Sequence, residues 1–141
     1  MKKTILTYGT FDLFHIGHLN ILRRLRMLGD ELVVGVSTDQ FNELKGKKTV
    51  IRFEDRIDIV SSLRCVDIAI PEICWEQKAS DIKKYGVAVF GIGDDWAGHF
   101  DELNSLCEVV YLPRTEGVSS RVLKQVISES ASILPGEPGD S

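Results

Sequence analysis

Short apolar runs recur along the chain at the spacing expected for buried strands. The four clearest cover residues 5–8, 32–36, 87–90 and 109–112. Runs of this kind, with almost no polar interruption, are typical of strands buried on both faces. A weaker strand is predicted at residues 67–70.

The segment between the first two strands has the pattern of a helix. Leucines recur there every third residue from Leu19 to Leu28, and Gly29 supplies a C-terminal stop. Further helices are predicted at residues 53–63, 76–85 and 119–130. Alternating strands and helices predict an α/β fold in which helices cover both faces of a parallel sheet. Ligands of such sheets bind beyond the carboxyl ends of the strands.

Length and composition fit one folded domain. The chain has 141 residues, of which 43% are hydrophobic and 27% charged, so we predict one domain over residues 1–130. Residues 131–141 are expected to form a disordered tail, because 134–141 are rich in proline, glycine and acidic residues. The three widely spaced cysteines suggest reduced structural thiols.

The net charge of −4 makes a nucleic-acid polymer an unexpected partner, although a few clustered cations would still bind a small anion. No apolar run has the length of a signal peptide or a membrane span. We therefore expect a cytoplasmic protein without membrane insertion.

The first segment with recognisable chemistry is Y-G-T-F-D-L-F-H-I-G-H, which runs from Tyr8 to His18. It leaves a strand and enters a helix near Gly17, so His15 and His18 share one helical face. The N–H groups of a helix start attract anions, and two imidazoles would add hydrogen bonds to phosphate oxygens. For a bare pair of this spacing, a capping, packing or metal-binding role is the alternative.

This segment resembles the nucleotidyltransferase superfamily that shares an H-x-G-H motif, here His15 to His18. The resemblance implies a Rossmann-like domain in which both histidines stabilise the transferring phosphate without forming a covalent intermediate. It also implies that Gly9, Thr10 and Phe11 contact the nucleotide. Catalysis of this kind depends on positioning and electrostatics.

A lysine-rich segment, E-L-K-G-K-K, covers residues 43–48. A solvated loop is the simplest interpretation, but mobile lysines also close over phosphates. Glycerol-3-phosphate cytidylyltransferases have a similar loop, and this resemblance implies that Lys45 contacts the acceptor phosphate and Lys47 the nucleotide.

A third segment, R-T-E-G-V-S-S, follows the last strand and starts a helix at Ser119 or Ser120. Two interpretations are open, a capped helix or an anion-binding helix start in which Arg114 donates two hydrogen bonds to a phosphate. It closely matches R-T-E-G-I-S-T of the same family, which binds the nucleotide. The implied nucleotide ligands are Arg114, Thr115, Glu116, Gly117, Val118, Ser119, Ser120 and Arg121. Ser120 in place of threonine keeps the hydroxyl, whereas Arg121 is less typical.

Two tryptophan segments, W-E-Q-K from Trp75 and G-D-D-W ending at Trp96, also resemble glycerol-3-phosphate enzymes. Packing is the alternative role for both aromatics. The resemblance places Trp75 and Lys78 at the acceptor, and Asp94 and Asp95 at the nucleoside.

Two arginines complete the implied acceptor site. Arg64 lies in R-C-V-D, similar to the family's R-Y-V-D near the subunit contact, and Cys65 replaces the usual aromatic residue. Arg56, in F-E-D-R, is assigned to the acceptor in the same way, and the alternative is an exposed cation on a helix.

Together the motifs predict attack by the phosphate of glycerol 3-phosphate on CTP, which gives CDP-glycerol and pyrophosphate. His15, His18, Lys45, Lys47 and Arg114 are the expected catalytic residues. Transfer to another phospho-alcohol, adenylyl transfer, or a silent nucleotide-binding regulator are the alternatives.

Mg²⁺ or another divalent cation is expected with CTP, held mainly by phosphates and water. Asp12 is the candidate protein ligand. The resemblance further implies a homodimer and a place in teichoic acid or capsule synthesis.

Overall fold

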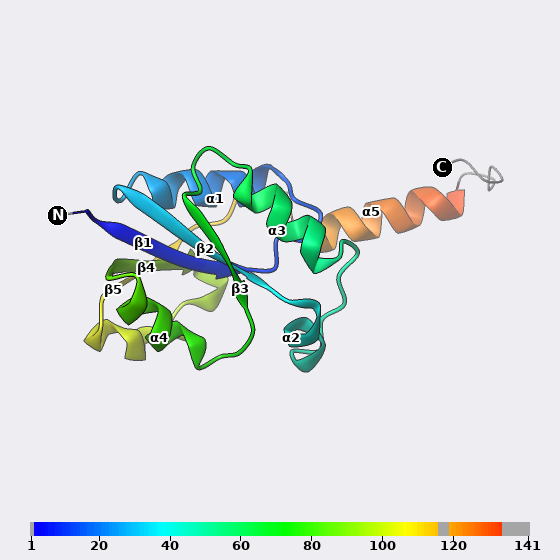
Figure 1. Cartoon of the computed structure of the whole chain (residues 1–141). Coiled ribbons are helices and arrows are strands. Elements are labelled where there is room, and N and C mark those ends of the chain that lie inside the picture. The colour runs from blue at the N-terminus through cyan, green and yellow to red at the C-terminus, as the bar shows by residue number, and fades with distance from the viewer. Residues whose placement is uncertain (1, 116–118, 134–141) are drawn as a thin grey trace.

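The strands form one parallel sheet in the computed structural model, which describes residues 2–115 and 119–133 (Figure 1). Its members are β1 (Thr4–Gly9), β2 (Glu31–Ser37), β3 (Ile68–Glu72), β4 (Val87–Gly93) and β5 (Glu108–Leu112). Their order is β3-β2-β1-β4-β5, and each neighbouring pair is parallel. The Rossmann-like α/β prediction is therefore confirmed, including its weaker strand.

The strands alternate their side chains between two apolar clusters. In β2, Leu32 and Val34 face one cluster and Val33 faces the other, as the two-residue period of a strand requires. Leu25 also belongs to the first cluster and Ile82 to the second. Both faces of the sheet are buried, which explains why the strand sequences are almost continuously apolar.

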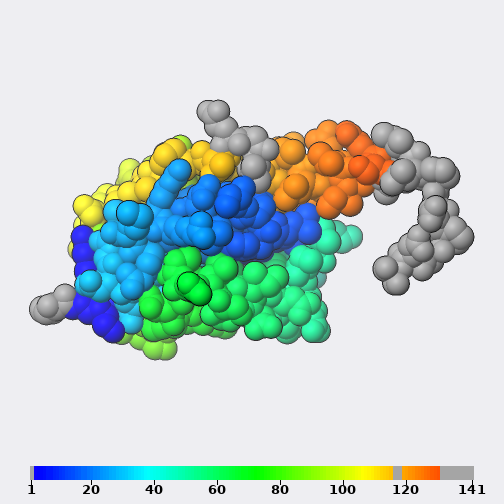
Figure 2. All heavy atoms as spheres, turned by 90° about the horizontal axis from the view of Figure 1, so that it is seen from above, coloured from blue at the N-terminus to red at the C-terminus, as the bar shows by residue number. Residues whose placement is uncertain are grey.

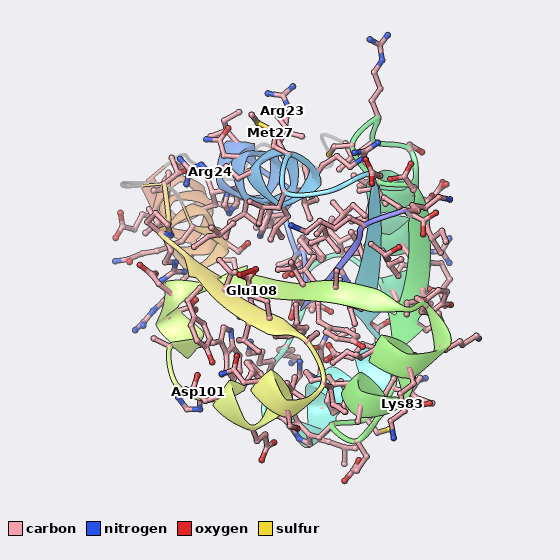
Figure 3. The ribbon with its side chains drawn as sticks, turned by 90° about the vertical axis from the view of Figure 1, so that its left-hand side faces the viewer. Arg23, Arg24, Met27, Lys83, Asp101 and Glu108 are labelled. Carbon is pink, nitrogen blue, oxygen red and sulfur yellow. The ribbon has the colours of Figure 1, made fainter. Side chains whose placement is uncertain are left out.

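Helices cover both faces of the sheet (Figure 1). The first face carries α1 (Ile16–Arg26) and α3 (Phe53–Ser61), which lie side by side in Figure 2. The opposite face carries α4 (Gln77–Lys84) and the short 3-10 helices η1 (Asp94–Trp96) and η2 (Asp101–Ser105). Figure 3 views the end near the start of β5, where Arg23 and Met27 point outward from α1.

Two helices differ from the sequence prediction. Helix α2 (Asp39–Leu44) was not predicted, because six residues are too few to show a helical period. Helix α5 (Ser120–Ile133) runs past residue 130 and projects from the body (Figure 1). The remainder of the predicted tail, residues 134–141, lies outside the described residues.

Strand β1 is central and lies between β2 and β4. Helix α1, which connects β1 to β2, lies on one face of the sheet. Helix α4, which leads into β4, lies on the opposite face. This is the switch point at which ligands of open α/β sheets bind. Among the described residues, no helix has the length and apolarity needed to cross a membrane.

Candidate active site

The loop after β1 is held in an unusual backbone conformation. Phe11 and Leu13 both have positive φ angles, 55° and 48°, which are uncommon for residues with a side chain. The Phe11 ring folds back over Gly9, where an added Cβ would lie 2.7 Å from ring carbons. A side chain at Gly9 would therefore displace the Phe11 ring, and the loop directs the chain into α1.

His15 and His18 form the cap of α1. The Nδ1 atom of His15 accepts the Gly17 N–H at 3.0 Å, and Nδ1 of His18 accepts the His15 N–H at 3.2 Å. The rings stack with their centroids 3.9 Å apart. Because each Nδ1 is an acceptor, the proton of each neutral imidazole is on Nε2. The capping role and the ligand-facing role are therefore compatible.

Both imidazoles are neutral near pH 7. Burial, aided by the neighbouring His15, lowers the pKa of His18 to about 4. Burial and the nearby Arg114 guanidinium also lower the pKa of His15. Within the described residues, the buried Nε2 of His15 has no hydrogen-bond partner, so this N–H is available to a ligand oxygen.

A hollow of about 400 Å³ opens at the carboxyl ends of β1 and β4. It brings together residues from the β1 loop, α1, the lysine segment, the end of β4 and the start of α5. Predicted site residues on its wall are Gly9, Thr10, Phe11, Asp12, His18, Lys47, Asp95, Arg114, Thr115, Ser119, Ser120 and Arg121. Its size is that of a small-molecule pocket.

Asp12 is buried beneath this hollow and binds protein groups. Its carboxylate accepts the N–H groups of Val50 and Ile51 at 2.8 and 2.9 Å and pairs with Lys124 Nζ at 2.8 Å. Burial raises the pKa of the Asp12 carboxyl, but Lys124 and the two N–H groups outweigh it, so the pKa is lowered. In this geometry Asp12 ties three segments together.

Arg56 is fully buried. It is therefore not the exposed helix cation that the sequence offered as one alternative. Its guanidinium donates to the carbonyls of Ile51, Thr10 and Ser37 and to Asp39 Oδ1, at 2.6–2.8 Å. The prediction that Arg56 binds substrate is not supported by this geometry, because these protein groups occupy the guanidinium. Arg56 supports the loops on which the site is built.

The lysine segment begins in the last turn of α2 rather than in a free loop. Lys45 is half-buried, with Nζ 4.5 Å from the Phe41 ring centroid and 5.7 Å from that of Trp75. The pKa of Lys45 is lowered to about 8, mainly by burial and also by Lys47 and Lys78, while Glu72 opposes them. Gly46, at φ 72°, lets the chain turn so that Lys47 lies by Trp96.

A second cavity of about 70 Å³ adjoins the hollow, and Tyr8, Gly9 and Lys47 line both. It is also lined by Lys45, Lys78 and Trp75, the predicted acceptor residues. Lys78 is buried, and its Nζ lies 2.7 Å from Glu72 Oε2. The sequence did not point to Glu72, although its position at the end of a strand is where such residues gather.

Trp75 and Trp96 contact each other at 6.3 Å between ring centroids. Trp75 also packs edge-on against Phe41. Since both tryptophans line the second cavity, packing and ligand contact are not exclusive. Asp95 lines the main hollow, whereas Asp94 is exposed at the start of η1 and is not on its wall.

The third motif closes the hollow from the β5 side. Thr115 Oγ1 accepts a hydrogen bond from Asn20 of α1 at 3.1 Å. Ser119 caps α5 by accepting the Val122 N–H at 3.1 Å, and Ser120 Oγ donates to the Asp12 carbonyl. Glu116, Gly117 and Val118 lie outside the described residues.

Arg64 is not brought to this site within one chain. It is exposed and lies between the end of α3 and the start of β3. Since α3 runs back against the parallel strands, that connection is at the amino ends of the strands, opposite the hollow. Arg64 therefore contributes nothing to the hollow of its own chain.

The described residues do not form a protein cage for a divalent cation. Among them, no group of three or more histidine, cysteine, aspartate or glutamate residues is placed to hold a metal. Asp12 already binds a lysine and two N–H groups. A cation held mainly by phosphates and water would not need such a cage.

Lys124 is a site residue that sequence reasoning missed. Its Nζ pairs with Asp12 and donates to the Lys48 carbonyl at 3.2 Å. The signal for it was its spacing, since a residue four positions after Ser120 shares one helical face with it.

Comparison with known proteins agrees with this architecture. The family model for cytidylyltransferase-like proteins matches residues 6–133. The chain is 54% identical over 128 residues to the glycerol-3-phosphate cytidylyltransferase of Bacillus subtilis, covering 91% of this chain and 98% of that protein. It is 50% identical over 123 residues to the enzyme of that name from Staphylococcus aureus, covering 87% and 93%.

Solved structures show the same fold. The lipopolysaccharide core biosynthesis protein of Thermoplasma volcanium aligns with a TM-score of 0.72 and 25% identity, covering 82% of this chain and all of that one. A pantoate-beta-alanine ligase from Francisella tularensis aligns at 0.61 and 12% identity, covering 99% and 74%, and shows the fold alone. With the paired histidines at the switch point of the sheet, these matches establish that the chain belongs to the cytidylyltransferase-like family.

Proposed function

We propose that this chain transfers the cytidylyl group of CTP to glycerol 3-phosphate and so forms CDP-glycerol and pyrophosphate. Relatives at 50% and 54% identity carry the name of this activity. The observation that carries the proposal is the pair of adjoining cavities, one lined by His18 and one lined by lysines.

The reaction brings two anions together, and the chain supplies the groups that this requires. A phosphate oxygen of glycerol 3-phosphate attacks the α-phosphorus of CTP, and the bond from that phosphorus to the bridging oxygen breaks. The electron pair leaves with pyrophosphate. No proton needs to move, because the attacking phosphate is already ionised near neutral pH.

The histidines act on the charge that develops at the α-phosphate. The Nε2–H groups of His15 and His18 donate to its oxygens, and their Nδ1 atoms are fixed by the start of α1. Donors that are held in place before reaction stabilise a transition state without reorganising. Lys45 and Lys47 offset the negative charge of the two substrates, and Arg114 that of the leaving group.

A divalent cation is part of the proposal. Mg²⁺ would arrive with CTP and neutralise its phosphate oxygens, held mainly by phosphate and water. Homodimer formation, a cytoplasmic location and supply of CDP-glycerol for teichoic acid or capsule polymers also remain proposals. Sedimentation of the purified protein tests the dimer.

The activity is tested by measuring pyrophosphate release with each nucleoside triphosphate and a panel of phospho-alcohols. Release with CTP and glycerol 3-phosphate is the expected result. Release with ATP only, or with no pair, contradicts the proposal. The second outcome would instead fit a nucleotide-binding regulator.

A further inference from the structure

Glu72 places a buried carboxylate at the edge of the second cavity. It is the last residue of β3, and its side chain is 4% exposed. The same cavity is lined by Lys45 and Lys78. A negative charge in a site for a phosphorylated acceptor works against phosphate binding, so its presence needs a physical reason.

The ion pair with Lys78 engages one of the two oxygens of this carboxylate. Lys78 Nζ lies 2.7 Å from Oε2, and Nζ also lies 4.6 Å from the centroid of the Tyr8 ring. Within the described part of the chain, no hydrogen bond reaches the other oxygen, Oε1. A carboxylate oxygen that the protein does not bind takes its hydrogen bond from solvent or from a ligand. One oxygen of Glu72 is thus left for a donor in the cavity.

The nearby Asp81 provides a contrast. Its Oδ2 accepts the Tyr8 hydroxyl at 2.6 Å, and burial together with this bond raises the pKa of Tyr8. Asp81 is not among the residues that line the hollow or the second cavity. Asp81 therefore serves the packing of α4 against β1, whereas Glu72 faces the space in which an acceptor would lie.

The charges around the cavity indicate which kind of group on the acceptor would donate to Glu72. Lys45, Lys47 and Lys78 line it together with one carboxylate. An acceptor with an ammonium group would bring a further cation toward three lysines, at a repulsive cost. An acceptor with neutral hydroxyl groups meets no such repulsion, and a hydroxyl hydrogen is the natural partner of a carboxylate oxygen.

We propose that Glu72 determines acceptor specificity by accepting a hydrogen bond from a free hydroxyl group of the phosphorylated acceptor. This assignment rests on the proposed function, since it concerns the acceptor of the same reaction. The acceptor phosphate lies toward the lysines, and its hydroxyl-bearing carbons lie toward Glu72. Glu72 thus distinguishes a polyol phosphate from a simple alkyl phosphate and from an aminoalkyl phosphate.

The test compares kcat/KM for glycerol 3-phosphate, propyl phosphate and phosphoethanolamine at fixed CTP. The wild-type protein should prefer glycerol 3-phosphate over propyl phosphate by about ten- to a hundredfold, the usual range for a hydrogen bond to a charged group. Phosphoethanolamine should be no better than propyl phosphate. Glu72→Gln should lower the preference for glycerol 3-phosphate by about fivefold or more.

A structural role for Glu72 would alter turnover of all three acceptors in the same proportion and leave their ratios unchanged. Glu76→Gln is the matched control, because Glu76 is exposed and does not line the second cavity, and it should keep the wild-type ratios. If Glu72→Gln does not fold, Glu72→Met combined with Lys78→Met removes the pair without leaving a buried charge, and should lower the same ratio.

The outcomes separate the two proposals. Equal use of glycerol 3-phosphate and propyl phosphate by the wild-type protein, or unchanged ratios in the Glu72 variants, overturns the assignment of Glu72 and leaves cytidylyl transfer standing. Preference for phosphoethanolamine overturns it as well. Absence of turnover with CTP and every acceptor overturns the proposed function itself.

Discussion

Each of the two histidines has two roles, one in the cap of α1 through Nδ1 and one as a donor through Nε2–H. The Nδ1 atom of His15 caps α1, and that of His18 accepts the His15 N–H. Each bond fixes a tautomer and leaves the proton of the ring on Nε2. The low pKa of both rings keeps them neutral donors, so their role does not depend on gaining a charge near pH 7.

Replacement of His18 by alanine should separate binding from turnover. We expect His18→Ala to lower kcat by about a hundredfold or more, because a donor to the developing charge is lost, with the Kd of CTP changed by less than about threefold. Single-turnover kinetics and CTP titration measure the two quantities. His99→Ala, which removes the exposed third histidine, is the control. Equal losses in kcat and CTP affinity would contradict a transition-state role.

Loss of the proton from Lys45 should lower the use of the acceptor at alkaline pH. Its pKa of about 8 means that the charged form predominates below pH 8 and is lost as the pH rises. At subsaturating CTP, kcat/KM for glycerol 3-phosphate should therefore fall above about pH 8. Lys45→Arg should move this decline to higher pH, since arginine stays charged.

The matched control for this pH profile is Lys84→Arg, on an exposed turn of α4, which should leave the decline in place. An identical decline in wild type and Lys45→Arg would assign the titration to another group.

At the scale of elements, buried polar residues hold loops that the sheet leaves unpaired. Arg56 of α3 binds the carbonyls of Thr10 and Ser37, which follow or end neighbouring strands. Asp12 and Lys124 join the start of α5 to residues 50 and 51. The strands set the position of the site, and these polar contacts set the shape of its loops.

The two arginines predicted at the acceptor should differ in their effect on stability. Arg56→Ala leaves three carbonyls and Asp39 without their buried donor, so the free energy of unfolding should fall by about 3–5 kcal/mol. Arg64→Ala removes an exposed side chain and should change it by less than about 0.5 kcal/mol. Urea denaturation of both variants measures this. A small effect of Arg56→Ala would show that its bonds are replaced by water.

At the scale of the whole molecule, the division of the site into two cavities matches a reaction with two anionic substrates. The larger cavity lies beside the helix start and His18, and the smaller one beside Lys45 and Lys78. Lys47 lines both. The fold therefore offers each phosphate its own set of donors.

Metal binding should follow the nucleotide. Because Asp12 is engaged by Lys124, we expect calorimetry to detect strong Mg²⁺ binding only when CTP is present. Removal of Mg²⁺ with EDTA should abolish turnover without unfolding the protein. Tight Mg²⁺ binding to the nucleotide-free protein would reveal a metal site made by the chain itself.

Much of the fold and part of the site could be predicted from the sequence. Continuous apolar runs indicated the strands, and the H-x-G-H, lysine and R-T-E-G segments indicated the hollow. Helix α2 was missed because it is short, and the roles of Arg56 and Glu72 were missed because they depend on partners distant in sequence. Patterns along the chain carry periodicity, whereas pairings across the fold do not appear in them.

The alternation of strands and helices and the family motifs could be read from the amino-acid sequence, because they depend on local periodicity and on residue types at fixed spacing. Which charged side chains are bound by other protein groups became visible only in the folded chain. The guanidinium of Arg56 and both carboxylate oxygens of Asp12 are bound by protein groups, while Lys45 and Glu72 line the second cavity and, within the described residues, only one oxygen of Glu72 is bound. The reason is that burial and hydrogen-bond partners, not residue type, determine whether a charge is available to a ligand.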